Sequence, residues 1–65
     1  MEDKLRNEIE REIDKMETHI KQMNIVMSIM LSEGFDVEET QDEIFFLERK
    51  IKLFQLLLID KIRDN

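Results

Sequence analysis

Apolar residues in the first half of the chain recur every three or four positions, the spacing of one side of an α-helix. The intervals alternate between four and three residues, which is the heptad pattern of a coiled coil. Glu, Lys and other polar residues fill most positions between them. The pattern predicts a helix over residues 2–33, with a core row made of Ile9, Ile13, Met16, Ile20, Met23, Met27 and Met30.

The helical pattern stops at residues 32–36, which read SEGFD. Gly34 suits the left-handed residue that follows a helix end, and Phe35 stands where such ends favour an apolar contact with the last turn. Asp36 is a good N-cap for a second helix. Stop and start signals this close together predict a turn at residues 34–36 between two antiparallel helices.

Residues 37–63 carry the same heptad pattern, which predicts a second helix. Its core row is Val37, Thr40, Ile44, Leu47, Ile51, Phe54 and Leu58. When the chain folds back at the turn, core residues whose numbers sum to 70 or 71 meet, as Ile20 meets Ile51. The sequence therefore predicts an all-α fold, an antiparallel two-helix hairpin forming a single domain over residues 1–65, and we expect it to assemble into a larger helical bundle.

Both helices carry more apolar residues than the core of a hairpin needs. Each such side chain left in water forgoes about 1.5–3 kcal/mol of burial free energy, and contiguous apolar patches usually mark contacts. Three of them, spaced seven and four residues apart on the second helix, predict a second apolar stripe. We therefore expect a protein interface at Ile25, Val26, Ile29, Phe45, Phe46, Leu53, Leu56, Leu57 and Ile59.

The occupant of that interface stays open at the level of sequence. A second copy would close a four-helix bundle, and two-fold dimers are the commonest assembly. An apolar helix of a different protein would be held as in helix-in-groove recognition. Association is expected in either case, because a chain of 65 residues buries only about 60% of its unfolded surface and this one has no cysteine for a disulfide.

Charge narrows the choice of partners. The formal net charge is −6, which disfavours nucleic acids and anionic membranes. Acids gather around the turn with no base between them, as helix N-termini favour, and the sequence leaves open whether they also serve a function. They are Glu33, Asp36, Glu38, Glu39, Asp42 and Glu43.

Nothing at the start of the chain resembles the basic and apolar segments of a signal peptide. The longest unbroken apolar run, residues 56–59, is far shorter than a membrane span. We therefore expect a soluble cytoplasmic protein with no membrane partner.

Catalytic chemistry is not indicated. His19 is the only histidine, which excludes a Cys/His zinc site and the paired Glu-x-x-His motifs of di-iron bundles. The sequence has no Gly-rich phosphate loop, nucleophile elbow or Cys–His pair. We expect no enzyme activity, no metal site and no cofactor.

The turn segment 32–36, together with Leu47-Glu48 and Ile51 on the second helix, resembles the small YscE-like co-chaperones of type III secretion needle subunits. That family is similar in length and in its two antiparallel helices joined by a short Gly/Asp turn. The resemblance covers nearly the whole chain at the level of layout. It implies a heterodimeric chaperone role that keeps an aggregation-prone needle protein soluble in the bacterial cytoplasm.

Two other functions are compatible with the pattern. One is a homodimeric regulator, such as an antirepressor-type protein inhibitor that uses its acidic surface to occupy a basic site. The other is a Rop-like RNA-binding bundle, which the net charge disfavours unless Arg49, Lys50 and Lys52 form a local basic face.

Overall fold

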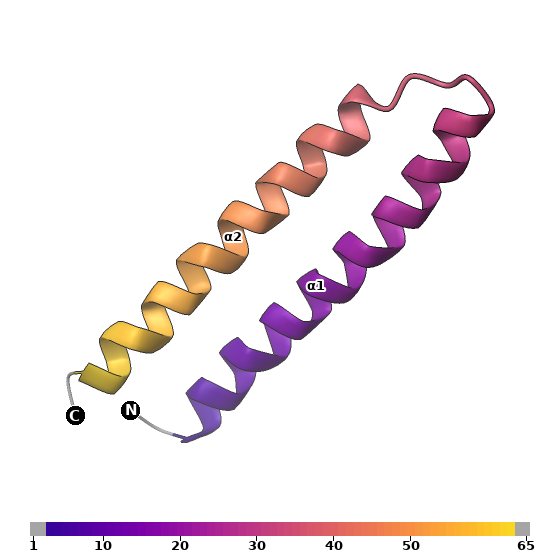
Figure 1. The fold of residues 1–65 in the computed structure, drawn as a ribbon. Helices are drawn as coiled ribbons and strands as arrows, with labels where there is room; N and C mark the ends of the chain where they lie inside the picture. The colour runs from indigo at the N-terminus through magenta and orange to yellow at the C-terminus, as the bar shows by residue number, and fades with distance from the viewer. Residues whose placement is uncertain (1–2, 64–65) are drawn as a thin grey trace.

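The computed structural model describes the backbone of residues 3–63 and the side chains of residues 3–60. Two helices, α1 (Asp3–Ser32) and α2 (Glu38–Arg63), lie side by side and antiparallel, and both ends of the chain are at the same end of the molecule (Figure 1). The predicted all-α hairpin is confirmed. The bounds of α1 and the start of α2 differ from the predicted ones by one residue.

Backbone hydrogen bonds at the end of α1 form a Schellman motif. The Phe35 amide donates to the Met30 carbonyl oxygen at 2.9 Å, and the Gly34 amide donates to the Leu31 carbonyl oxygen at 3.1 Å. Gly34 has a φ of 83°, in the left-handed region that glycine adopts without strain. Phe35 is nevertheless 61% exposed, so most of its side chain meets solvent.

The start of α2 is capped by Asp36. Its Oδ1 accepts a hydrogen bond from the Glu38 amide at 3.0 Å, which satisfies one of the free amides in the first turn of a helix. The first backbone bond of α2 runs from the Gln41 amide to the Val37 carbonyl oxygen at 2.9 Å. Five residues therefore connect the two helices, and this short connection is enough to reverse the direction of the chain.

Every predicted core residue is buried or half-buried, and every other described side chain is exposed. The most buried are Ile9, Ile13, Met23 and Ile44, which are 6–9% exposed. Ile20 and Ile51 line the same groove between the helices, as the predicted pairing requires. The heptad spacing alone thus placed both core rows correctly.

The hairpin is a flat rod whose core is only two helices wide. It measures 51 × 15 × 10 Å, and its radius of gyration of 15.3 Å exceeds the roughly 10.7 Å of a compact chain of this length. Its accessible surface is 5457 Å², against about 4,400 Å² for a typical compact protein of 7.9 kDa. About 1,000 Å² more surface therefore meets solvent than a compact protein of this size would expose.

Candidate protein-interaction face

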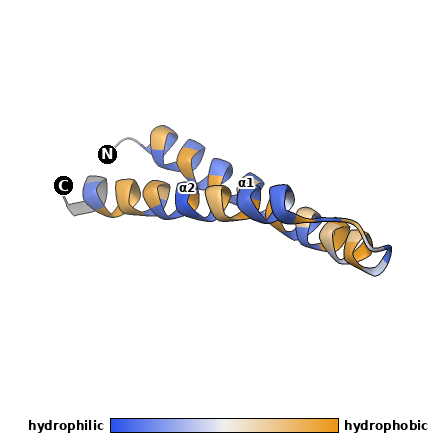
Figure 2. Ribbon diagram, turned by 90° about the horizontal axis from the view of Figure 1, so that it is seen from above, coloured by the Kyte–Doolittle hydropathy of each residue, from blue (hydrophilic) through white to orange (hydrophobic). Residues whose placement is uncertain are grey.

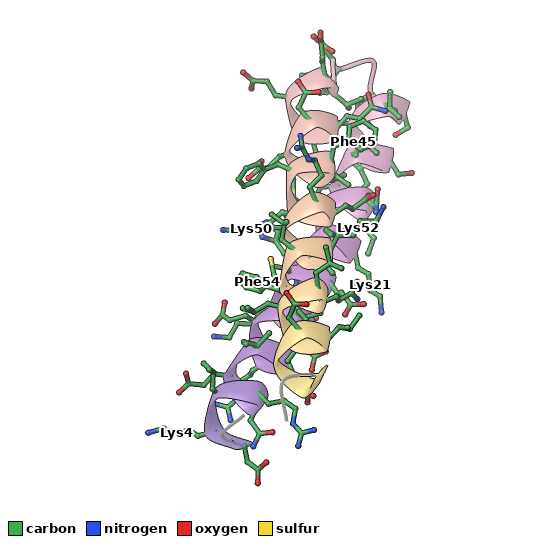
Figure 3. All side chains as sticks on the ribbon, turned by 90° about the vertical axis from the view of Figure 1, so that its left-hand side faces the viewer. Lys4, Lys21, Phe45, Lys50, Lys52 and Phe54 are labelled. Carbon is green, nitrogen blue, oxygen red and sulfur yellow. The ribbon has the colours of Figure 1, made fainter. Side chains whose placement is uncertain are left out.

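Two grooves run between the helices, one on each side of the core. The first, of about 400 Å³, is lined by Glu17, Ile20, Lys21, Glu48, Ile51, Lys52 and Gln55. The second, of about 310 Å³, is lined by His19, Gln22, Met23, Val26, Thr40 and Glu43. Lys21 and Lys52 extend from one side of the hairpin, and Lys50 extends from the opposite side of α2 (Figure 3). We call the side of the first groove the polar face and that of the second groove the apolar face.

Residues seven apart, or one turn apart on the same side of a helix, share a face of a coiled coil. Val26 and Glu43 line the groove of the apolar face. Ile29 lies one turn after Val26, and Phe46 lies one turn after Glu43, so Ile29 and Phe46 belong to the same face. Their exposed fractions are 58% and 62%. By the same spacing, the exposed apolar residues of this face are Leu5, Val26, Ile29, Phe46, Leu53 and Leu57.

These six side chains are distributed along the length of the hairpin, and on α1 exposed polar residues of the same face, such as His19 and Gln22, separate Leu5 from Val26. Ile29 and Val26 lie near the turn, Leu5 lies near the open end, and the residues of α2 lie between them. Their exposed fractions add up to about three whole side chains. At about 1.5–3 kcal/mol for each, burying them would contribute roughly 5–10 kcal/mol before the costs of association.

The polar face differs from the apolar face in the middle of the hairpin, where it carries charged residues. Phe45 and Ile59 belong to this face, because each lies seven residues from Lys52. They are 56% and 52% exposed. Between them the groove is bordered by Glu48 and Lys52 of α2 and by charged residues of α1. Its exposed apolar residues are therefore separated by a charged stretch.

The structure thus divides the predicted interface between several surfaces. All of its residues are exposed, but they do not form one patch. Ile25 and Leu56 lie on the outer edges of the helices, and Leu56 lines a shallow depression of about 250 Å³ with Arg49, Lys52 and Leu53. Five of the predicted residues lie on the apolar face: Val26, Ile29, Phe46, Leu53 and Leu57.

Leu5 is a member of the apolar face that the sequence prediction missed. It is 43% exposed and lies in a charged stretch of α1, where no neighbouring apolar residue marks it as part of a patch. Its distance from Val26, which is three heptads, was the signal that could have found it. Apolar residues crowd α1 more densely near the turn, as Figure 2 shows in orange.

A lysine partly covers the apolar face. The Nζ of Lys50 lies 5.7 Å from the ring centroid of Phe46, within the range of a cation–π interaction. Lys52, two residues further on, lines the groove of the polar face and, together with Arg49, the outer depression. Two of the three bases therefore lie close together, and Lys50 lies on the other side of α2.

Polar chemistry is sparse in the part of the chain that the structure describes. His19 is exposed and borders the second groove. Among residues 3–60, no group of three His, Cys, Asp or Glu side chains is placed to hold a metal ion. Neither described helix contains a stretch that is long and apolar enough to cross a bilayer.

Comparisons with protein-family models, with curated proteins and with solved structures found no match for this chain. Its function is therefore inferred from the two faces of the hairpin.

Proposed function

We propose that this chain is a helical protein-binding module that packs its apolar face against the apolar side of another helical protein. The observation that carries the proposal is the set of six exposed apolar side chains on one face, against three on the other, Leu31, Phe45 and Ile59. A set distributed over this length matches a helix better than a small molecule, because the hairpin is 51 Å long and its grooves are shallow. Recognition of an apolar helix face by such a surface is a common mode of protein binding.

Within this class, we propose a chaperone-like role toward a helical subunit that would aggregate when its apolar side is free. The resemblance to the type III secretion needle co-chaperones implies such a partner. The Met-rich core of α1 supports it, because Met23, Met27 and Met30 allow a helix to adjust its packing when a partner binds.

A homodimeric regulator is the second candidate. It is favoured by the acids around the turn, from Glu33 to Glu43, all of which are exposed and available to a basic site on a target. The two candidates differ in what covers the apolar face. A chaperone presents it to its client, whereas a regulator uses it to join its own subunits and meets its target elsewhere.

Site-specific photocrosslinking in the source cells tests the proposal. Ile29 and Leu31 make a matched pair, because they are 58% and 56% exposed and lie two residues apart on α1. They belong to opposite faces, since Leu31 is two heptads from Glu17 of the polar groove. A benzophenone side chain at position 29 is expected to crosslink a defined helical protein, identified by mass spectrometry, and the same group at position 31 is not.

Each outcome of that experiment has a definite meaning. An adduct of one defined foreign protein at position 29 supports the chaperone role. An adduct of twice the chain mass there, with a foreign protein captured from the acidic turn, supports the regulator. Equal crosslinking from positions 29 and 31, or none from either, contradicts a binding module that uses one face.

A further inference from the structure

Helix α2 carries acids at its start and most of its bases near its middle. Its first six residues include Glu38, Glu39, Asp42 and Glu43 and no base. From residue 44 to residue 63 there are five bases and two acids, so this part has a net charge of +3. Three of these bases, Arg49, Lys50 and Lys52, lie near the middle of the helix. Two hairpins stacked antiparallel keep their acidic turns at opposite ends of the dimer, whereas parallel stacking places both acidic turns at the same end.

We propose that a second copy of this chain covers the apolar face, with the two hairpins antiparallel so that α2 packs on α2. This proposal rests on the proposed function, because it uses the same apolar face. It states what covers that face when no other protein is bound. The two-fold axis crosses the long axis of the hairpin, and the turn of each copy lies at the open end of the other.

The apolar row of α2 suits this arrangement. Phe46 and Leu57 lie eleven residues apart, and Leu53 is within two residues of their midpoint, which is about 2 Å along the helix axis. A two-fold axis at that midpoint therefore brings Phe46 against Leu57 of the partner subunit at both ends, and Leu53 beside the aliphatic part of Lys50 of the partner subunit. Such a pattern is self-complementary, as an isologous interface requires.

The face is also large enough for a stable dimer. The hairpin extends over 51 × 15 Å, a projected area of about 770 Å² per copy, which is of the same order as the roughly 800 Å² per partner of a standard interface. Covering this face would remove most of the additional accessible surface that the hairpin has relative to a compact protein of its mass. The polar face, with Glu48 and Lys52 at its middle, stays in contact with water.

Sedimentation equilibrium of the purified chain and of two variants tests which face is used. Phe45 and Phe46 are 56% and 62% exposed and lie on opposite faces, so Phe45→Glu is the matched control for Phe46→Glu. The unaltered chain is expected to dimerise, Phe46→Glu to raise the dimer Kd about thirtyfold or more, and Phe45→Glu to change it less than threefold.

Circular dichroism accompanies each variant, and Val26→Glu on α1 is a second variant of the same face in case Phe46→Glu loses helicity. A chain that is monomeric at all concentrations overturns the proposal. Equal weakening by Phe45→Glu and Phe46→Glu also overturns it. Neither result touches the proposed function, because a foreign adduct from position 29 would still report binding of a client.

Disulfide trapping tests the orientation, since the chain has no cysteine of its own. Leu53→Cys is expected to form a disulfide-linked dimer on mild oxidation. A parallel dimer instead places Val26 against Phe46 of the partner subunit, because these residues lie at the same level of the hairpin, and a mixture of Val26→Cys and Phe46→Cys would crosslink. That second pattern, without a Leu53→Cys dimer, overturns the antiparallel arrangement.

Salt dependence gives an independent check. The antiparallel dimer keeps the two acidic turns apart, so its Kd is expected to change less than about threefold between 0.05 and 0.5 M NaCl, a range over which the Debye length shortens. A Kd that falls severalfold with salt indicates that the acidic turns lie together and contradicts the proposal.

Discussion

The two faces of the hairpin flank the same core yet differ in what they can bind. Phe45 and Phe46 are neighbours in the sequence with similar exposure, but Phe45 lies on the face of a groove bordered by charged side chains, whereas Phe46 shares its face with other exposed apolar residues. On the polar face, Lys21, Glu48 and Lys52 keep the middle of the hairpin hydrated. An exposed aromatic ring therefore indicates a partner only when its neighbours on the same face are apolar too.

The contrast also separates folding from binding. The core rows define the hairpin, and both faces share them equally, so the core says nothing about which face is used. The positions beside the core carry that information, because they lie at the surface of the isolated hairpin. A module with one partner surface is expected to have different residues beside the core on its two faces. Two equally apolar faces would favour open-ended association.

The largest effect is expected from removing the apolar row itself. Leu53→Glu combined with Leu57→Glu should abolish association, raising the dimer Kd more than a hundredfold, because each charge would enter the centre of an apolar interface. Phe45→Glu combined with Ile59→Glu places the same charges on the polar face and should leave the Kd within about fivefold. Analytical ultracentrifugation measures both. Association that survives the first pair would remove the distinction between the faces.

A core substitution should lower stability without favouring either face. Ile44 is 6% exposed, and Ile44→Ala should lower the free energy of unfolding by about 2–3 kcal/mol through lost burial and an unfilled cavity. Urea unfolding followed by circular dichroism at fixed concentration measures this, with Phe45→Ala as an exposed control expected to cost under about 0.5 kcal/mol. An Ile44→Ala protein as stable as the parent would contradict the assignment of the core.

The turn holds the helices in the register on which both faces depend. Gly34 has a φ of 83°, and a Cβ atom added there would have no neighbour within 4 Å, so Gly34→Ala would meet conformational strain but no clash. The expected cost is about 1 kcal/mol in urea unfolding, and Gly34→Asn should cost less because Asn tolerates the left-handed region better. An alanine variant equal to the parent would mean that the turn adopts another conformation in solution.

Heptad spacing was enough to predict the fold, because burial at the core is periodic and each helix contributes an unbroken row, from Ile9 to Met30 and from Val37 to Leu58. The candidate site was harder. Phe46, Leu53 and Leu57 were identified as a stripe by their spacing, but Phe45 and Ile59 were grouped with them because a segment rich in apolar residues does not say which side each one takes. That assignment required the position of each residue relative to the grooves.

The smallest effect is expected from the contact between Lys50 and Phe46, which Lys52 does not share. Lys50 lies 5.7 Å from the ring centroid of Phe46, whereas Lys52 lines the polar groove. A double-mutant cycle of Lys50→Gln and Phe46→Leu, measured by urea unfolding at a concentration where the protein is monomeric, should give a coupling energy of about 0.5 kcal/mol. The equivalent cycle of Lys52→Gln and Phe45→Leu should give none, because those residues lie seven apart along the helix. Equal coupling in the two cycles would mean that Lys50 samples water as freely as Lys52, and that the apolar row is fully open to a partner.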